Sequence, residues 1–143
     1  MDLFKDIQNF HEKFELVFDG KPRVLPEDLA KFRIGFLMEE LGEYCLDNEV
    51  AQRFFTTELK KYTAPQNIPL DKQLDALVDL VYVALGTAYL QGFDFNEAWR
   101  RVHEANMKKV RALRVIDSKR GSTYDVVKPE GWQAPDLSDL VRA

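Results

Sequence analysis

The chain has 143 residues, a net charge of −4 and 45% hydrophobic residues, which indicates one ordinary globular domain and not a disordered chain. The acidic balance argues against binding nucleic acid through a basic surface. The single cysteine, Cys45, excludes an intrachain disulfide, and we expect it to be a small buried side chain. No secretory signal pattern opens the sequence, and the longest apolar run, 80–85, is far too short to span a membrane. We therefore expect a soluble cytoplasmic protein without a membrane partner.

The first half of the chain predicts three helices. Apolar residues recur every three or four positions over 2–18, and the Asp-Gly-Lys-Pro stretch at 19–22 predicts the break that follows. Pro26 and the acids after it predict the start of a second helix, from 27 to about 46. Within 47–64 the spacing of apolar residues predicts a short third helix, and a loop follows at 63–69.

The second half predicts two longer helices and an irregular end. Helical periodicity covers about 70–91, and Gly92 is placed to end that helix in a left-handed conformation. A further helix is expected over 95–111, with Asp94 or Asn96 as its N-cap. The tail, 112–143, predicts irregular structure with a short β element around 124–128. The sequence thus predicts one all-α domain, 1–143, of four or five helices.

The helix expected at 70–91 is apolar almost all round, most clearly over 80–85. A helix of this composition is expected to be buried on several sides. Because the chain is small, we expect a second subunit to cover one of those sides.

Two acidic clusters lie on two of the predicted helices. Glu39, Glu40 and Glu43 share one face of the second helix, and Asp75 and Asp79 are one turn apart in the apolar helix. Like charges on one face repel, and unpaired carboxylates among apolar residues are costly, so a cation is expected to neutralise them. Hard oxygen ligands suit Mg²⁺ or Mn²⁺. The simpler alternative for the glutamates is a solvated face.

Other chemistries find less support in the sequence. The two histidines, His11 and His103, are too few for a zinc site, and no glycine-rich phosphate loop is present. Phosphate would therefore have to be held by metal and by lysine or arginine. The basic segment at 99–110 is either a solvated helix end, where cations suit the helix dipole, or a phosphate-binding edge.

Taken together in this order and spacing, the motifs resemble the MazG-like all-α nucleoside triphosphate pyrophosphohydrolases, closest to the phosphoribosyl-ATP pyrophosphohydrolase-like branch. The resemblance covers roughly 1–140. The stretches that carry it are 39–43 (EELGE), 75–82 (DALVDLVY), 86–94 (ending GFD), 103–109 (HEANMKK) and the closing segment 124–137.

The resemblance implies Mg²⁺-dependent cleavage of the α–β phosphoanhydride of a small-molecule nucleotide, with Mn²⁺ as a second candidate metal. It makes Glu40, Glu43 and Asp79 metal ligands, and Glu39 a further ligand or base. Either Glu39 or Glu40 would orient or deprotonate the attacking water.

The family's second acidic motif is usually ExxD, and Ala76 stands here in place of its first acid. Asp75, one turn before Asp79, is the candidate replacement ligand. The resemblance further implies that Asn106 and Lys109 contact phosphate or base, that Lys109 stabilises developing charge, and that Lys128 closes over the site. It also implies assembly as a homodimer or homotetramer.

Two alternatives to an enzyme stay open. A non-catalytic nucleotide- or metal-binding regulator on the same fold is favoured by the missing acid at Ala76. A helical interaction module without a ligand would leave the carboxylates facing water.

Overall fold

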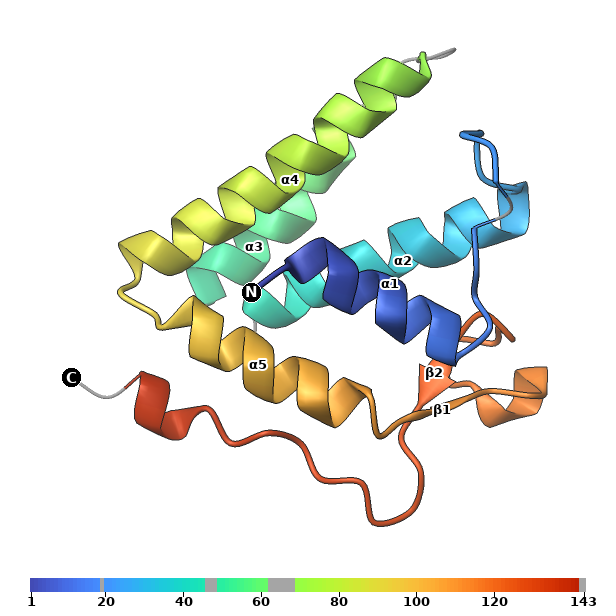
Figure 1. Ribbon diagram of the computed structural model, residues 1–143. Helices are drawn as coiled ribbons and strands as arrows, with labels where there is room; N and C mark the ends of the chain where they lie inside the picture. Colours follow the sequence, from blue (N-terminus) through green and yellow to red (C-terminus); the bar gives the residue numbers. More distant parts are fainter. Residues whose placement is uncertain (19, 46–48, 62–68, 142–143) are drawn as a thin grey trace. The chain divides into compact units, whose positions relative to one another are not determined.

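The structure, a computed structural model, describes residues 1–18, 20–45, 49–61 and 69–141 and is mainly helical (Figure 1). The described residues contain the α-helices α1 (Leu3–Lys13), α2 (Glu27–Tyr44), α3 (Glu49–Glu58), α4 (Leu70–Leu90) and α5 (Phe95–Asn106). Short 3₁₀ turns follow α3 and interrupt the tail: η1 (Leu59–Lys61), η2 (Val115–Asp117) and η3 (Ser138–Leu140). Two-residue strands β1 (Val110–Arg111) and β2 (Val126–Val127) form the antiparallel β1–β2 ribbon. The predicted helical fold is confirmed, and the β element expected around 124–128 is β2.

The chain divides into two compact units, and each is described by itself. The first unit comprises Met1–Lys21 and Gln73–Ala143, and therefore holds α1, almost all of α4, α5, the β1–β2 ribbon and the tail. The second comprises Pro22–Lys72 and holds α2 and α3. The loop predicted at 63–69 and the predicted helix end at 46 lie outside the described residues, apart from Pro69.

The end of α1 differs from the prediction. The helix stops at Lys13, five residues before the predicted end at 18, and Glu15 has a positive φ of 58°. The N–H of Glu15 donates to the carbonyl of Glu12 at 3.2 Å and the N–H of Leu16 to that of His11 at 2.9 Å, which is a Schellman motif formed around a residue other than glycine. The guanidinium of Arg111, distant in sequence, also donates to the carbonyls of Phe14 and Glu15, both at 3.3 Å. These carbonyls are thereby bonded outside the helix, and local apolar periodicity could not reveal this contact.

α4 ends as the sequence predicts. Gly92 has φ +74°, its N–H donates to the carbonyl of Tyr89, and the N–H of Phe93 donates to that of Ala88, each at 3.0 Å. This pair of bonds is a Schellman motif, which satisfies carbonyls that the helix end would otherwise leave free.

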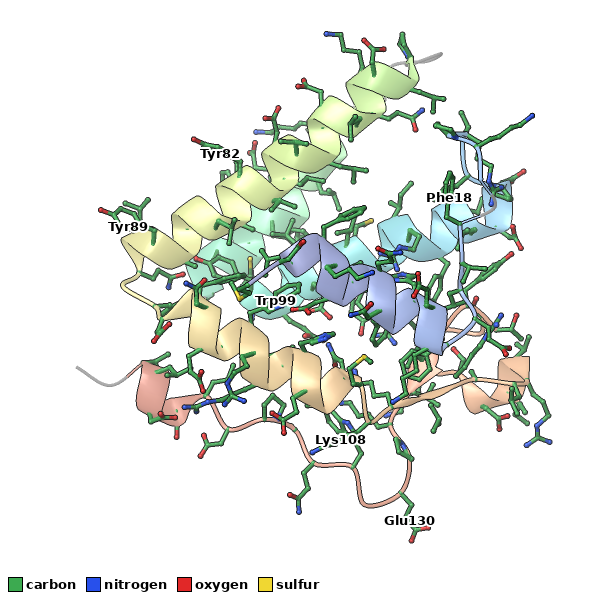
Figure 2. All side chains as sticks on the ribbon, viewed as in Figure 1. Phe18, Tyr82, Tyr89, Trp99, Lys108 and Glu130 are labelled. Carbon is green, nitrogen blue, oxygen red and sulfur yellow. The ribbon has the colours of Figure 1, made fainter. Side chains whose placement is uncertain are left out.

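The expectation that the chain buries α4 on several sides is wrong. Leu77 and Val81 are 56% and 54% exposed, and Tyr82 and Tyr89 are 78% and 82% exposed (Figure 2). By length and composition α4 is also the one helix in the described ranges that could cross a membrane, with a mean hydropathy of 1.3 in its most apolar window. Such a surface is typical of a helix that another apolar surface covers.

α5 begins as predicted and ends early. Asp94 is the N-cap, and its Oδ1 accepts a hydrogen bond from the N–H of Glu97 at 3.1 Å. The helix ends at Asn106, not at 111, because Val110 and Arg111 are extended and pair with Val127 and Val126. Strand pairing across a long loop has therefore replaced the last helical turn.

Few apolar side chains are buried in the described residues. They are Phe14, Cys45, Ala88, Ala105 and Ala112, so the burial expected for Cys45 is confirmed. The loop between β1 and β2 also buries an acid, Asp125, which is 1% exposed. Its Oδ2 accepts a hydrogen bond from the hydroxyl of Ser118 at 2.7 Å, and Arg120 pairs with it at 3.2 Å. This cluster fixes the loop.

Candidate functional site

The predicted glutamates lie in the last two turns of α2. The helix begins after Pro26 and carries Glu27 and Asp28 in its first turn, where acids suit the helix dipole. It runs unbroken to Tyr44, so Glu39, Glu40 and Glu43 have the spacing that places them on one face. All three are exposed.

The predicted aspartates lie in the first half of α4. Asp75 and Asp79 are exposed and one helical turn apart, on a helix whose other positions are mostly apolar. Ala76, at the position of the missing acid, is exposed too. Within the described parts of the chain, Glu43, Asp75 and Asp79 make no hydrogen bond or ion pair through their carboxylates.

The donor chemistry of these residues fits a hard divalent cation, because unpaired carboxylate oxygens are the ligands that Mg²⁺ and Mn²⁺ prefer. α2 and the two aspartates belong to different units, so each acidic set is described on its own helix. Among the described residues, no group of three or more histidine, cysteine, aspartate or glutamate side chains is gathered around one point.

The arginines of the basic segment, Arg100 and Arg101, both form ion pairs with acidic side chains of the chain itself. Arg100 donates to Glu97 at 2.7 and 2.9 Å and to Glu104 at 3.1 Å. Arg101 donates to Glu97 at 2.9 Å and, with two nitrogens, to the carboxylate of Asp139 at 2.6 and 3.0 Å. These bonds lower the pKa of Glu97 to about 2, raise the pKa of both guanidinium groups, and lower the pKa of Asp139 through Arg101.

The predicted phosphate-binding lysines gather at the end of α5. Lys109 immediately precedes β1 and Lys128 immediately follows β2. The ammonium groups of Lys109 and Lys128 lie 5.1 and 5.2 Å from the centroid of the Trp132 ring. Asn106, the last residue of α5, accepts the N–H of Lys109 at its backbone carbonyl, at 3.1 Å. The structure thus brings three of the predicted substrate-binding residues into one region.

Trp132 is the residue at this place that the sequence did not single out. Its indole N–H donates to the carbonyl of Ala105 at 2.7 Å, which attaches the tail to the last turn of α5. Sequence reasoning placed Trp132 only in the closing segment of the resemblance. The available signal was an aromatic residue after a Pro-Glu-Gly turn, four positions beyond Lys128.

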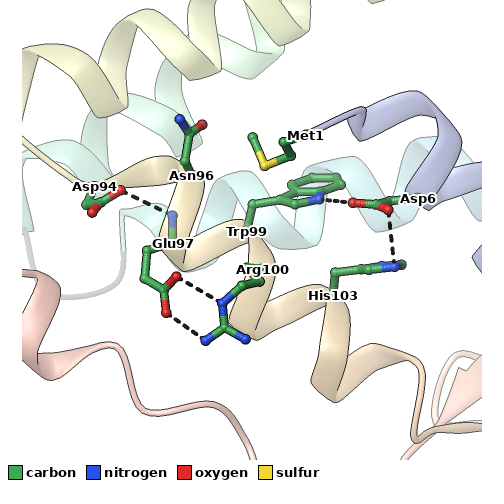
Figure 3. A pocket seen from close by; sticks show the side chains of 8 residues that line it. All are labelled: Met1, Asp6, Asp94, Asn96, Glu97, Trp99, Arg100 and His103. Atoms are coloured by element: carbon green, nitrogen blue, oxygen red, sulfur yellow. Dashed lines mark hydrogen bonds and ion pairs between the residues drawn. The ribbon is translucent and has the colours of Figure 1, made fainter.

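An open depression lies elsewhere on the first unit, where the N-terminus meets the first half of α5 (Figure 3). On one side of it Asp6 accepts the indole N–H of Trp99 at 2.9 Å and lies 3.6 Å from His103 Nε2. These bonds pack α1 against α5. The residues that line it are Met1, Asp6, Asp94, Asn96, Glu97, Trp99, Arg100 and His103. None of them is a predicted site residue.

Comparison with known proteins places the chain in a family. Residues 7–106 match the family model described as phosphoribosyl-ATP pyrophosphohydrolase. The chain belongs to the phosphoribosyl-ATP pyrophosphohydrolase family. The matched range contains both acidic helices and the start of the lysine-bearing region at Asn106, whereas Lys109, Lys128 and Trp132 lie beyond it.

A solved structure shares the fold of this family member. A protein of Exiguobacterium sp. 255-15, provisionally described as an NTP pyrophosphohydrolase, superposes with a TM-score of 0.67 and 24% sequence identity. The match covers 93% of this chain and 88% of that one. Comparison with curated proteins gave no match.

Proposed function

We propose that the chain is a Mg²⁺-dependent nucleotide pyrophosphohydrolase. It cleaves the α–β phosphoanhydride of a (deoxy)nucleoside triphosphate, or of a phosphoribosyl nucleotide, and releases the monophosphate and pyrophosphate. The observation that carries the proposal is the family match over 7–106, which spans the acidic residues of α2 and of α4. The unpaired carboxylates of Glu43, Asp75 and Asp79 support it, because a cation is the partner such oxygens lack.

In the proposed mechanism Glu40, Glu43, Asp75 and Asp79 would hold the metal, which when bound would supply charge neutralisation for the phosphates and a lowered pKa for water. Glu39 or Glu40 accepts the proton of the attacking water.

The cations at the end of α5 act on the phosphate chain. Lys109 stabilises the negative charge that develops on the phosphate oxygens as the anhydride bond breaks. Lys128 and Asn106 bind and orient the substrate. Cation–π contact with Trp132 keeps each of the two ammonium groups beside the same ring before substrate arrives.

The protein is proposed to act as a homodimer or homotetramer. The support is the apolar surface of α4, on which Leu77, Val81 and Tyr82 are all more than half exposed. Exposed apolar area of this kind marks a contact surface. Sedimentation equilibrium of the full chain measures the assembly, and a monomer at micromolar concentration contradicts this part of the proposal.

A second candidate is a non-catalytic regulator that binds nucleotide or metal on the same fold. The observation that favours it is Ala76, which offers no oxygen where the family's second motif usually has an acid.

The deciding experiment is pyrophosphate release with Mg²⁺ across a panel of canonical and modified dNTPs, NTPs and phosphoribosyl-ATP. Release from one or a few members supports the enzyme and names its substrate class. Binding of metal raises the melting temperature of a folded protein. No release from any member, together with a melting temperature raised by Mg²⁺ or Mn²⁺, favours the regulator. If neither pyrophosphate release nor a raised melting temperature is observed, both candidates are contradicted, and the helical interaction module without a ligand is left.

A further inference from the structure

The β1–β2 ribbon is flanked at one end by two lysines, Lys109 and Lys128. Its antiparallel register pairs Val110 with Val127 and Arg111 with Val126. Lys109 immediately precedes β1 and Lys128 immediately follows β2, so the next position of the same register would set Lys109 across from Lys128. Figure 1 shows the ribbon just beyond the end of α5. Like charges directly opposite each other on an antiparallel pair are destabilising. A second interaction that stabilises the two ammonium groups is therefore expected at this position.

The ring of Trp132 provides that interaction. Both ammonium groups approach it, with centroid distances of 5.1 Å from Lys109 Nζ and 5.2 Å from Lys128 Nζ. A cation within about 6 Å of an indole centroid is attracted by the negative face of the ring. One aromatic side chain thus contacts both cations of the pair.

The ring itself is held from two directions. The N–H of Trp132 donates to the carbonyl of Pro129 at 3.1 Å, and Gly131 has φ +78°, so 129–132 form a tight turn with glycine at the position that needs a positive φ. From the other side the indole N–H donates to the carbonyl of Ala105, a residue only 7% exposed. The turn and the helix end together fix where the ring lies relative to the ribbon.

We propose that Trp132 is a positioning residue, which holds Lys109 and Lys128 as a two-cation clamp for the phosphate chain of the substrate. This inference rests on the proposed function for the identity of the ligand. Two cations that are already gathered lose little conformational entropy when an anion binds, and the anion relieves their mutual repulsion. A pyrophosphate group, which carries several charged oxygens, can bind both ammonium groups at once.

The test is a mutant cycle on the full chain, read as the affinity for inorganic pyrophosphate in the presence of Mg²⁺ by titration calorimetry. Trp132→Leu removes the ring face and is expected to weaken binding roughly tenfold, which is the size of two exposed cation–π contacts. Trp132→Phe keeps an aromatic face and is expected to lose roughly two- to threefold. In the Lys109→Met/Lys128→Met background, Trp132→Leu is expected to change the affinity by less than about twofold.

Matched controls separate the clamp from general effects. Lys108→Met removes the neighbouring lysine, which pairs with Glu104, and Trp99→Phe changes the other tryptophan. Both are expected to bind pyrophosphate as the unmodified chain does. Circular dichroism checks that each variant is folded, and Trp132→Phe carries the test if Trp132→Leu is not.

Three results overturn the clamp: no detectable pyrophosphate binding by the unmodified chain, full binding by the double lysine variant, or an equal loss from Trp132→Leu in both backgrounds. The last result would give Trp132 a purely structural role. Failure of the proposed function gives a different result: the unmodified chain does not turn over any nucleotide, while the mutant cycle still shows coupling between Trp132 and the two lysines. Nucleotide turnover without coupling in the cycle supports the proposed enzyme and refutes the clamp.

Discussion

Arg101 and Asp139 join the middle of α5 to the end of the chain. Two guanidinium nitrogens of Arg101 donate to the two carboxylate oxygens of Asp139, at 2.6 and 3.0 Å, and one of them also donates to the carbonyl of Asp136 at 2.8 Å. A two-point contact of this geometry constrains orientation as well as distance. It holds η3 beside α5 although the two residues are 38 positions apart in the sequence.

Removal of this contact is expected to release the end of the tail. In Arg101→Ala we expect the amide of Leu140, which ends η3 and donates to the carbonyl of Leu137 just before η3, to exchange with solvent hydrogen faster than in the unmodified chain. Hydrogen exchange read by mass spectrometry measures this. Arg100→Ala is the matched control, because Arg100 pairs only with acids of its own helix, Glu97 and Glu104, in the contacts described above. Equal exchange in the two variants would refute the role of Arg101.

The decline of the free energy of unfolding at acid pH is expected to depend on Glu97. Its pKa of about 2 in the folded chain, against an ordinary 4.5, results first from the bonds of Arg100 and Arg101 to its carboxylate. A lowered folded pKa means that the stabilisation is complete above about pH 4.5 and is lost as the pH falls from 4.5 towards 2. Glu97→Gln should therefore flatten the decline of the free energy of unfolding in that window, measured by urea titration at several pH values. Glu130→Gln, on the exposed turn of the tail, should leave the decline unchanged (Figure 2).

The buried Asp125 is expected to be the most costly acid to remove. Asp125→Ala leaves the hydroxyl of Ser118 and the guanidinium of Arg120 without their partner in a site that is 1% exposed, so we expect a loss of about 3 kcal/mol in the free energy of unfolding. Asp117→Ala, which removes an exposed acid paired with Arg114 in the same loop, should cost much less. Urea unfolding measures both, and similar costs would contradict the structural role of the buried cluster.

The attachment of α1 to α5 depends on Asp6. Asp6→Ala removes the acceptor of the Trp99 indole N–H and should destabilise the chain by about 1–2 kcal/mol. Asp6→Asn keeps an acceptor oxygen and should cost less. Thermal unfolding followed by tryptophan fluorescence compares the two, and an equal effect would show that the hydrogen bond to Trp99 contributes little.

The metal assignment predicts loss of chemistry without loss of fold. Glu43→Gln and Asp79→Asn should each reduce kcat roughly 100-fold or more, because each removes a proposed ligand of the ion that neutralises the phosphates. Asp71→Asn, which removes an exposed acid from the first turn of α4, should keep kcat. The rise of melting temperature with Mg²⁺ should vanish in the first two variants and persist in the third. Full activity in both Glu43→Gln and Asp79→Asn would refute the assignment.

The sequence was informative where structure is local. The bounds of α2 and α4 follow from apolar periodicity, Pro26 and Gly92, and all of these act within a few residues of the helix ends. The ends of α1 and α5 could not be predicted in the same way. α1 stops at a left-handed Glu15, a residue type that gives no signal for such a stop, and Arg111 bonds the carbonyls beyond it. α5 stops where Val110 pairs with Val127, a contact between parts of the chain that are distant in sequence.

The same distinction applies to the candidate site. Lys109 and Lys128 were predicted from the resemblance, one residue at a time, and the structure brings them to one aromatic ring. The ring could not be predicted, because its place depends on strand register and on a turn that returns Trp132 to α5. The metal roles of the acids on α2 and α4 stay predictions.

The contact between Arg111 and the end of α1 also bears on the order in which the chain acquires its structure. A ribosome-bound chain that still lacks residue 111 can form the backbone bonds around Glu15, but not the two bonds that the guanidinium donates to the carbonyls of Phe14 and Glu15. We therefore expect the end of the N-terminal helix to fray in a nascent chain, and to become fixed once the arginine emerges about a hundred residues later.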